Sequence, residues 1–269
     1  MGRLSPGLLA LIVAAAAATA VATTASAADL PAAPAAGYNP PVYRPALYDW
    51  TGLYFGGHVG LGLLEDSVTT TTPTALQPAG IQTNLSPFAI IGGAQVGANF
   101  EVAPLVIGVE GTWTDSAISG SQITPSLLTG TSERSTSNAK WYATATGRVG
   151  YAVNDLLLYA KGGAAWMSVD YTQDILTGAS VTSSQIISDT RTGFTVGGGI
   201  EYGMTENLSA KIEYDFLDFG TNNYSFNSLS AASAALVLPV AVKSDTHMFS
   251  LGFNYRFNWS GGGAVAAKY

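Results

Sequence analysis

The sequence predicts an all-β protein: an eight-stranded antiparallel transmembrane up-and-down β-barrel with four long extracellular loops. Three observations lead to this prediction: a shortage of charge, alternating apolar and polar side chains, and connections of alternating length. Charged residues make up 11% of the 269 residues and apolar residues 47%, whereas soluble domains carry about 25% charged residues. Beyond the N-terminus no stretch approaches the roughly 18 apolar residues of a membrane helix. A closed barrel is the other architecture that satisfies every backbone group in lipid.

The N-terminal 27 residues have the pattern of a secretory signal peptide. Arg3 supplies the positive charge, Leu8 to Val21 form an apolar stretch, and Ala25-Ser26-Ala27 is a small-residue cleavage site. A buried alanine-rich helix is the alternative interpretation. The sequence therefore predicts export to the cell envelope, with residues 1–27 removed.

Three further regions follow the signal peptide. Residues 28–48 are rich in Pro and Ala and are expected to form an extended periplasmic tether. Its reach is about 60 Å if it adopts polyproline II geometry. Residues 49–258 are expected to form the outer-membrane barrel, and residues 259–269 a C-terminal tail.

The barrel prediction rests on alternating runs joined by connections of two kinds. The runs are Trp50–Leu63, Phe88–Glu101, Leu105–Thr114, Lys140–Val153, Leu156–Val169, Arg191–Tyr202, Leu208–Leu217 and His247–Phe257. The long polar connections are Leu64–Pro87, Asp115–Ala139, Asp170–Thr190 and Asp218–Thr246. The short turns are Val102–Pro104, Asn154–Asp155 and Gly203–Asn207. Long loops outside and short turns inside are typical of outer-membrane barrels.

Successive side chains of a strand point to opposite faces, so odd- and even-numbered residues of a run lie on different faces. In each run the charged residues share one of these two sets, or parities, and the apolar residues share the other. In the fifth run, for example, Leu158, Ala160 and Trp166 lie on one face and Lys161 on the other. No Lys, Arg, Asp or Glu lies on the apolar parity of any run. A cation facing lipid near the midplane costs about 2–4 kcal/mol. A soluble barrel with an apolar interior is the alternative, and it is expected to carry more Lys and Glu on its polar face.

Aromatic residues on the apolar parity mark both ends of the runs, as expected for interfacial girdles. The outer set is Phe88, Trp113, Trp141, Trp166, Phe216 and Phe249, and the periplasmic set is Phe100, Tyr151, Tyr202, Tyr255 and Phe257. The two sets predict the height of the bilayer on every strand.

Charges of both signs are predicted to point into the lumen, which eight strands make narrow enough for side chains to fill. They are Glu101, Glu110, Glu201, Glu213 and Asp215 with Arg148, Lys161, Arg191, Lys211 and Arg256. Five acids facing five bases favour structural ion pairs, because unpaired buried charges are costly. An ion pathway is the alternative, although a ring of one sign is more typical of a selective pore.

No enzymatic site is predicted. The chain has no Cys and only two His, and neither His58 nor His247 has a Ser and carboxylate partner at triad spacing. Enzymes that act on lipid A at a barrel rim remain the alternative. Gly197-Gly198-Gly199 precedes no helix and is expected to ease strand packing. We predict no catalytic residue, cofactor or metal site, and the net charge of −7 argues against a nucleic-acid partner.

Several motifs together resemble the alphaproteobacterial outer-membrane immunogenic-protein family, the RopB-like group of small OmpA-type barrels often labelled porin-family. They are Trp50–Gly57, Leu158–Ala165, Glu213-Tyr214 and Asp218-Phe219-Gly220. The resemblance covers Trp50 to Phe257. It implies a surface-antigen barrel in the outer membrane of a Gram-negative bacterium.

Two short segments gain a further interpretation from the resemblance. Ser250, Gly252, Tyr255 and Phe257 match the last-strand signal read by the barrel assembly machinery, although an ordinary amphipathic strand has the same pattern. Family members commonly end at that Phe, whereas this chain continues to Tyr269. Cleavage after Ala27 leaves Ala28-Asp29, as in relatives whose N-terminal amine is joined to peptidoglycan. A plain flexible leader is the alternative.

The expected function is a structural barrel that supports envelope integrity, with outer-membrane lipid, lipopolysaccharide, the assembly machinery and peptidoglycan as partners. Its polar loops, such as Thr69–Thr72, Ser132–Asn138 and Thr221–Asn223, are available for recognition. A narrow pore for small solutes and a surface protein binding haem or another ligand are the alternatives.

Overall fold

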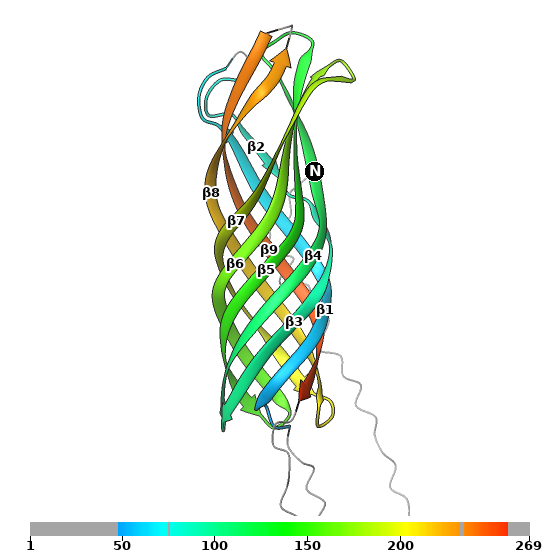
Figure 1. The fold of residues 1–269 in the computed structure, drawn as a ribbon, viewed down its shortest axis with the longest axis vertical. Coiled ribbons are helices and arrows are strands. Elements are labelled where there is room, and N and C mark those ends of the chain that lie inside the picture. Colours follow the sequence, from blue (N-terminus) through cyan, green and yellow to red (C-terminus); the bar gives the residue numbers. More distant parts are fainter. Residues whose placement is uncertain (1–47, 75, 232–233, 258–269) are drawn as a thin grey trace, which may run out of the picture. The chain divides into compact units, whose positions relative to one another are not determined.

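Nine antiparallel strands make up almost all of the described protein (Figure 1). The computed structural model describes residues 48–74, 76–231 and 234–257, without the side chains of 227–231 and 234–236. The predicted signal peptide, almost all of the tether and the C-terminal tail lie outside these residues. The strands are β1 (Gly52–Thr70), β2 (Gln82–Leu85), β3 (Phe88–Val102), β4 (Leu105–Pro125), β5 (Thr131–Val153), β6 (Leu156–Thr177), β7 (Ser180–Gly203), β8 (Leu208–Ala231) and β9 (Ala234–Phe257).

Eight of the strands form a closed ring in chain order, because β1 pairs with both β3 and β9. The closing ladder is long and runs from Leu53 opposite Phe257 to Thr70 opposite Val240. The short strand β2 adds to the ring only at its edge, where it pairs with β1 between Asp66 and Thr69. The predicted up-and-down order of eight strands is therefore confirmed.

The two ends of the ring differ in the length of their connections. At the short-turn end the strands are joined through residues 103–104, 154–155 and 204–207. Asn154 adopts a positive φ of 54°, which suits an asparagine in a tight turn. At the other end, called here the long-hairpin end, β4 and β5 are joined through residues 126–130 and β6 and β7 through residues 178–179.

The prediction of four long loops is wrong for most of the residues assigned to them, because the strands continue through these polar stretches. Strand residues occupy much of Leu64–Pro87, Asp115–Ala139, Asp170–Thr190 and Asp218–Thr246. Thr69–Thr70, Ser132–Asn138 and Thr221–Asn223, predicted as loop, are strand residues. Ser and Thr can pair across strands like other residues, and ladder irregularities between Asp115 and Ile118 and between Ala139 and Trp141 disturb the alternation.

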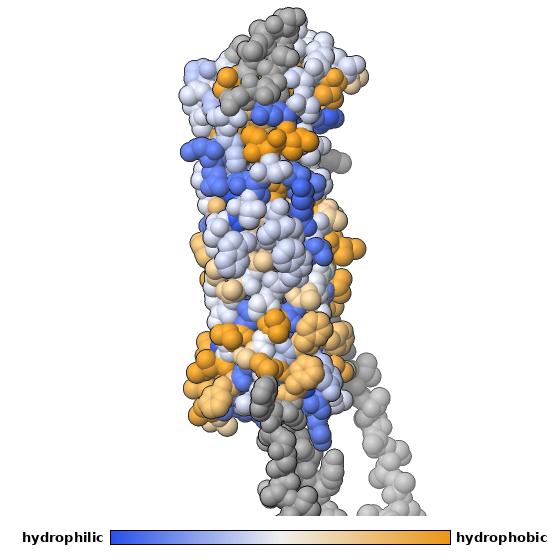
Figure 2. Space-filling view, in the orientation of Figure 1, coloured by the Kyte–Doolittle hydropathy of each residue, from blue (hydrophilic) through white to orange (hydrophobic). Residues whose placement is uncertain are grey.

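The outer face of the ring near the short-turn end is apolar. Val109 is 62% exposed while its neighbour Glu110 is 3% exposed, so the parity of β4 separates the two. Figure 2 shows apolar side chains concentrated toward the short-turn end of the visible face, with more polar ones above. Aromatic side chains on the outer face lie at the heights of both predicted girdles, for example Trp113 in the outer set and Tyr151 in the periplasmic set. Trp113 stacks on Trp141, with ring centroids 4.6 Å apart. Within the described residues, no helix is long and apolar enough to cross a membrane.

The interior changes in chemistry along the ring. A small aromatic and aliphatic cluster fills the short-turn end around Trp50 and Leu157. Charged and polar side chains fill the middle. A larger apolar cluster fills the long-hairpin end, and it includes Leu64, Tyr142 and Phe219.

The lipid-facing assignment makes a quantitative prediction. Val109→Lys places a cation on the outer face in the middle of the run Leu105–Thr114 of β4, and we expect it to lower the free energy of unfolding in lipid vesicles by about 2–4 kcal/mol. Denaturant titration measures the difference. Ser121→Lys is the control, because Ser121 is exposed on the same strand near the long-hairpin end. Equal stabilities of the two variants would contradict the assignment.

Candidate functional site

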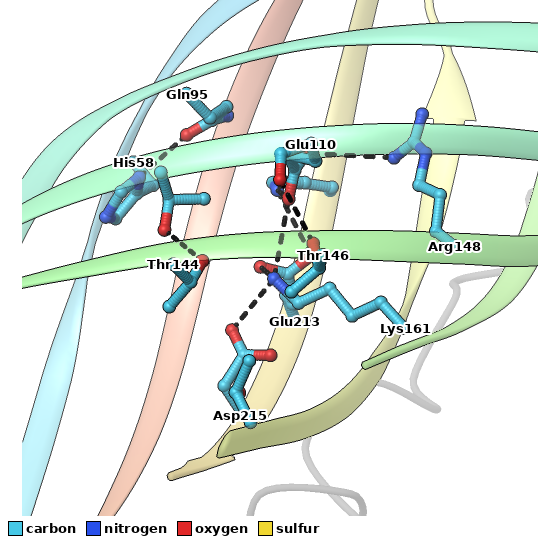
Figure 3. A network of polar contacts seen from close by, with 12 residues as sticks. His58, Gln95, Glu110, Thr144, Thr146, Arg148, Lys161, Glu213 and Asp215 are labelled. Carbon is cyan, nitrogen blue, oxygen red and sulfur yellow. Dashed lines mark hydrogen bonds and ion pairs between the residues drawn. The ribbon is translucent and has the colours of Figure 1, made fainter. Parts of the chain in front are cut away.

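A cluster of charged side chains crosses the middle of the lumen (Figure 3). Its carboxylates come from β4, β7 and β8, and its cations from β5, β6 and β8. The carboxylates are Glu110, Glu201, Glu213 and Asp215, and the cations are Arg148, Lys161 and Lys211. The ring brings them together from strands that are far apart in sequence, because all of these residues lie on the inward parity.

The two lysines hold the centre of this cluster. Lys161 Nζ lies 2.7 Å from Glu213 Oε1, 3.1 Å from Asp215 Oδ2 and 3.4 Å from Glu110 Oε1. Lys211 Nζ lies 3.2 Å from Glu110 Oε2 and 3.1 Å from Glu213 Oε2. Each ammonium is therefore shared between carboxylates. Removing one partner of such a buried set costs about 3–5 kcal/mol, because it leaves a charge without compensation.

Arg148 extends the cluster toward the short-turn end. Its Nη1 lies 3.2 Å from Glu201 Oε2, and its Nε donates to Asn99 Oδ1. Its guanidinium lies 4.7 Å from the ring centroid of Tyr54 and 5.1 Å from that of Tyr159. The two phenol groups in turn donate hydrogen bonds to Glu110 and Glu213. Charge, aromatic faces and hydroxyls thus fill the same section of the lumen.

Two glycines create the space that the cluster occupies. A Cβ on Gly197 would lie 2.1 Å from Asp215 Oδ1, and one on Gly252 would lie 3.1 Å from Lys211 Cε. The small residues on the wall thus make room for the long charged side chains of neighbouring strands. This role supports the packing interpretation of the 197–199 glycines.

At the short-turn end the segment before β1 folds into the lumen. Trp50 is 1% exposed, and its backbone N–H donates to Glu101 Oε2. The backbone N–H of Tyr48 donates to Asp155 Oδ1. Arg256 stacks on the Tyr48 ring and donates to the carbonyls of Thr51 and Glu206. We call residues 48–51 with these contacts the N-terminal strap.

Arg191 lies apart from the central cluster, at the long-hairpin end, and this corrects the expectation that it pairs with the lumen acids. Its guanidinium donates to Tyr171 Oη and Ser244 Oγ. It also donates to the backbone carbonyls of Phe219, Gly220 and Val242. The alternation in the sequence predicts that Arg191 points inward. It does not predict the position along the barrel axis at which the side chain finds its partners.

The contacts of Arg191 lie where the ladder between β7 and β8 ends. That ladder runs from Gly203 opposite Ser209 only to Phe194 opposite Asp218. The ladders of β6 with β7 and of β8 with β9 continue farther toward the hairpin ends. Arg191 therefore bridges β7 to β8 and β9 at the point where backbone pairing between β7 and β8 stops.

The histidines are both engaged by neighbouring side chains. His58 points inward, where its ring nitrogens lie 2.7 Å from Gln95 Oε1 and 3.0 Å from Thr114 Oγ1. His247 lies on the outer parity, 2.8 Å from the Tyr214 hydroxyl. Neither arrangement resembles a catalytic triad.

The residues of the expected assembly signal lie on β9, within the ladder to β1 that closes the ring. Ser250 and Gly252 face inward, whereas Tyr255 and Phe257 face outward with about half of their surface exposed. Ala28 and Asp29, the expected peptidoglycan attachment, lie outside the described residues.

Among the buried carboxylates in the stretches expected to be loops are two on the inner face that the sequence did not predict. Asp66 is 2% exposed and accepts hydrogen bonds from Ser137 and Ser244, and Glu133 is 5% exposed. Both fall in stretches that were predicted to be loops. On β1 the alternation continues unbroken, so Asp66 has the same inward parity as Tyr54, and it was missed because the strand was expected to end at Leu63. On β5 the alternation is interrupted, because Lys140 is an extra residue in the β5–β6 ladder and reverses the parity that Glu133 would otherwise have.

Comparison with known proteins yields relatives from the outer membranes of bacteria. The 31 kDa outer-membrane immunogenic protein of Brucella melitensis is 27% identical over 215 residues, 78% of this chain and 85% of that protein. The 25 kDa outer-membrane immunogenic protein of the same organism is 25% identical over 261 residues, 93% of this chain and 99% of that protein. The 22 kDa outer membrane protein of Rhizobium leguminosarum bv. viciae is 31% identical over 138 residues, 51% of this chain and 56% of that protein.

A solved structure shares the fold. The outer membrane protein OprG from Pseudomonas aeruginosa matches with a TM-score of 0.50 at 16% identity, over 77% of this chain and 97% of that protein. The expected resemblance to the immunogenic proteins and the expected location in the outer membrane are confirmed by these relatives. The sequence pattern of the OmpA-like transmembrane domain matches residues 49–261, and the chain therefore belongs to the OmpA-like transmembrane domain family of outer-membrane proteins.

Proposed function

We propose that this protein is a structural outer-membrane barrel with a closed lumen, which supports envelope integrity and presents its long-hairpin end to the outside. The observation that carries the proposal is the filling of the lumen at three heights. The N-terminal strap fills the short-turn end, the charge cluster fills the middle, and the apolar cluster around Leu64, Tyr142 and Phe219 fills the long-hairpin end.

The charge cluster argues for a structural role over a pore. Lys161, Lys211 and Arg148 each contact carboxylates at 3.2 Å or less, so these groups hold one another rather than line an open path. A selective pathway is more typically lined by a ring of one sign. His58 likewise gives no support to haem binding, because both of its ring nitrogens are hydrogen-bonded to neighbouring side chains.

The N-terminal strap supports a mechanical link between the barrel and the layer beneath it. Two hydrogen bonds from backbone N–H groups to carboxylates of the barrel, together with the burial of Trp50, attach residues 48–50 to the barrel. Because residues 48–50 are held to the barrel, tension on the chain before them acts on the whole barrel and does not pull β1 out of the sheet. We propose that the Pro-rich segment carries this tension to peptidoglycan through the amine of Ala28, next to Asp29.

A closed lumen predicts that the folded protein carries no steady ion current. Reconstituted in a planar bilayer at neutral pH, it is expected to be electrically silent, because side chains occupy the lumen at every height. A sustained current that changes with Lys161→Ala, inside the lumen, but not with Lys243→Ala, exposed on the outer face, would overturn the closed-lumen proposal.

We also propose that Ser250, Gly252, Tyr255 and Phe257 form the signal for barrel assembly. Phe257→Ala is then expected to lower the folded fraction in the outer membrane severalfold, as measured by the shift between unheated and boiled samples on a gel. Phe253→Ala is the matched control, because Phe253 lies on the same face of β9 with 56% exposure against 54% for Phe257. A similar loss in both variants would indicate ordinary strand packing instead of a signal.

The proposed attachment predicts a covalent product. Muramidase digestion of cell walls is expected to release a muropeptide joined through an amide bond to the amine of Ala28, and mass spectrometry identifies the linkage. A peptide from the barrel serves as the internal control, since it should be recovered unmodified. Recovery of Ala28 solely as a free amine would contradict the attachment.

A further inference from the structure

Glu133 lies inside the long-hairpin end, beyond the part of the ring that spans the membrane. It is 5% exposed and lies on β5, eight positions before Trp141 of the outer aromatic set. At about 3.3 Å per residue, this spacing corresponds to about 26 Å along the strand. We call the interior around Glu133 the mouth of the barrel.

The carboxylate of Glu133 is incompletely satisfied. Its Oε2 accepts a hydrogen bond of 3.2 Å from Gln173 Nε2, whereas its Oε1 has no hydrogen-bond partner among the described residues. A cavity of about 10 Å³ lies beside it, which approaches the volume that one water requires. The lining mixes hydroxyls, side-chain amides and apolar groups: Val68, Thr70, Gln77, Ile81, Thr83, Thr124, Ser135, Gln173, Leu238 and Val240.

No cation faces this carboxylate within the described part of the chain. The described residues that line the cavity come from β1, β2, β4, β5, β6, β9 and the segment after β1, and Glu133 is the one ionisable side chain among them. The adjacent Arg134 turns to the other face of β5, where its Nε and Nη2 donate to Asp174 Oδ2 on β6. Asp66 and Arg191 are the inward charges nearer the membrane, and Ser244 bonds to both of them.

This isolation sets Glu133 apart from the other buried acids. Glu110, Glu201 and Glu213 contact Lys or Arg in the central cluster. Asp66 accepts hydrogen bonds from two serine hydroxyls, one of which also binds Arg191. A buried carboxylate without such partners favours its neutral form, because burial penalises the charge.

We propose that Glu133 is a proton-controlled lock of the mouth: the protonated side chain keeps the hairpin walls packed, and loss of its proton hydrates the cavity and loosens them. The lock is separate from the central charge cluster, so the lumen stays closed to ions when the mouth loosens. The proposal is independent of the attachment to peptidoglycan.

The pH range follows from the environment of the carboxyl group. Burial raises the pKa of Glu133 from 4.5 to about 7, and the nearby amides of Gln77 and Gln173 offset only part of this effect. Below pH 4.5 the group is protonated whether the mouth is open or closed. As the pH rises from 4.5 to 7, only the open form loses the proton, and the closed form therefore becomes progressively less favoured.

Hydrogen exchange of the full-length protein in bilayer nanodiscs tests the lock. The backbone amides of residues 131–137 and 171–177 are compared between the wild type and Glu133→Gln at the same pH. Between pH 4.5 and pH 8.5 the ratio of wild-type to variant exchange rates is expected to rise at least about tenfold. The rise in this ratio cannot exceed roughly 300-fold, because that factor corresponds to the shift of the Glu133 pKa from 4.5 to about 7. A ratio that does not change with pH overturns the proposal.

Two further measurements guard against indirect effects. Glu65→Gln is the matched control, since Glu65 is a half-buried carboxylate on the outer parity of β1, and it should leave the pH response intact. Loss of the response in this variant would also overturn the proposal. If Glu133→Gln does not fold, the carboxyl carbon shift of Glu133 in the wild type, titrated by NMR, decides: a midpoint near 7 supports the lock, and one near 4.5 refutes it.

Discussion

Closure of the ring through the β1–β9 ladder is the constraint on which the rest of the structure depends. In lipid no water is available to satisfy backbone N–H and C=O groups, so a sheet that crosses the membrane cannot leave an edge open. The ladder from Leu53–Phe257 to Thr70–Val240 removes that edge along the whole length of β1. Once the ring is closed, one parity of every strand faces lipid and the other faces a narrow interior.

The narrow interior then determines what its side chains can do. Eight strands leave too little space for bulk water, so each inward charge must find a partner from another strand. Lys161 and Lys211 meet this requirement by sharing Glu110 and Glu213, while Arg148 lies between the rings of Tyr54 and Tyr159. In the closed lumen that we propose, the side chains that balance charge also exclude water, so ion pairing and closure have the same origin.

The long-hairpin end follows a different principle. There the strands leave the membrane, and the interior is held by apolar contacts between Leu64, Tyr142, Phe219 and their neighbours. Arg191 supports this region where the β7–β8 ladder stops, by donating to carbonyls of β8 and β9. Among the described residues no cation faces Glu133 in these surroundings, which is why we propose that its proton is a structural component of the mouth.

The sequence by itself determined which face of each membrane-spanning strand is apolar and in which order the strands follow. Both depend on a period of two residues and on connection lengths, which are local properties. Only the tertiary structure decided which cation meets which carboxylate, because parity gives a direction but no height or distance across the ring. It also decided that the polar stretches continue as strands. Continuation of β1 past Leu63 brought Asp66 inside, and the ladder irregularity at Lys140 brought Glu133 inside against the parity of its run.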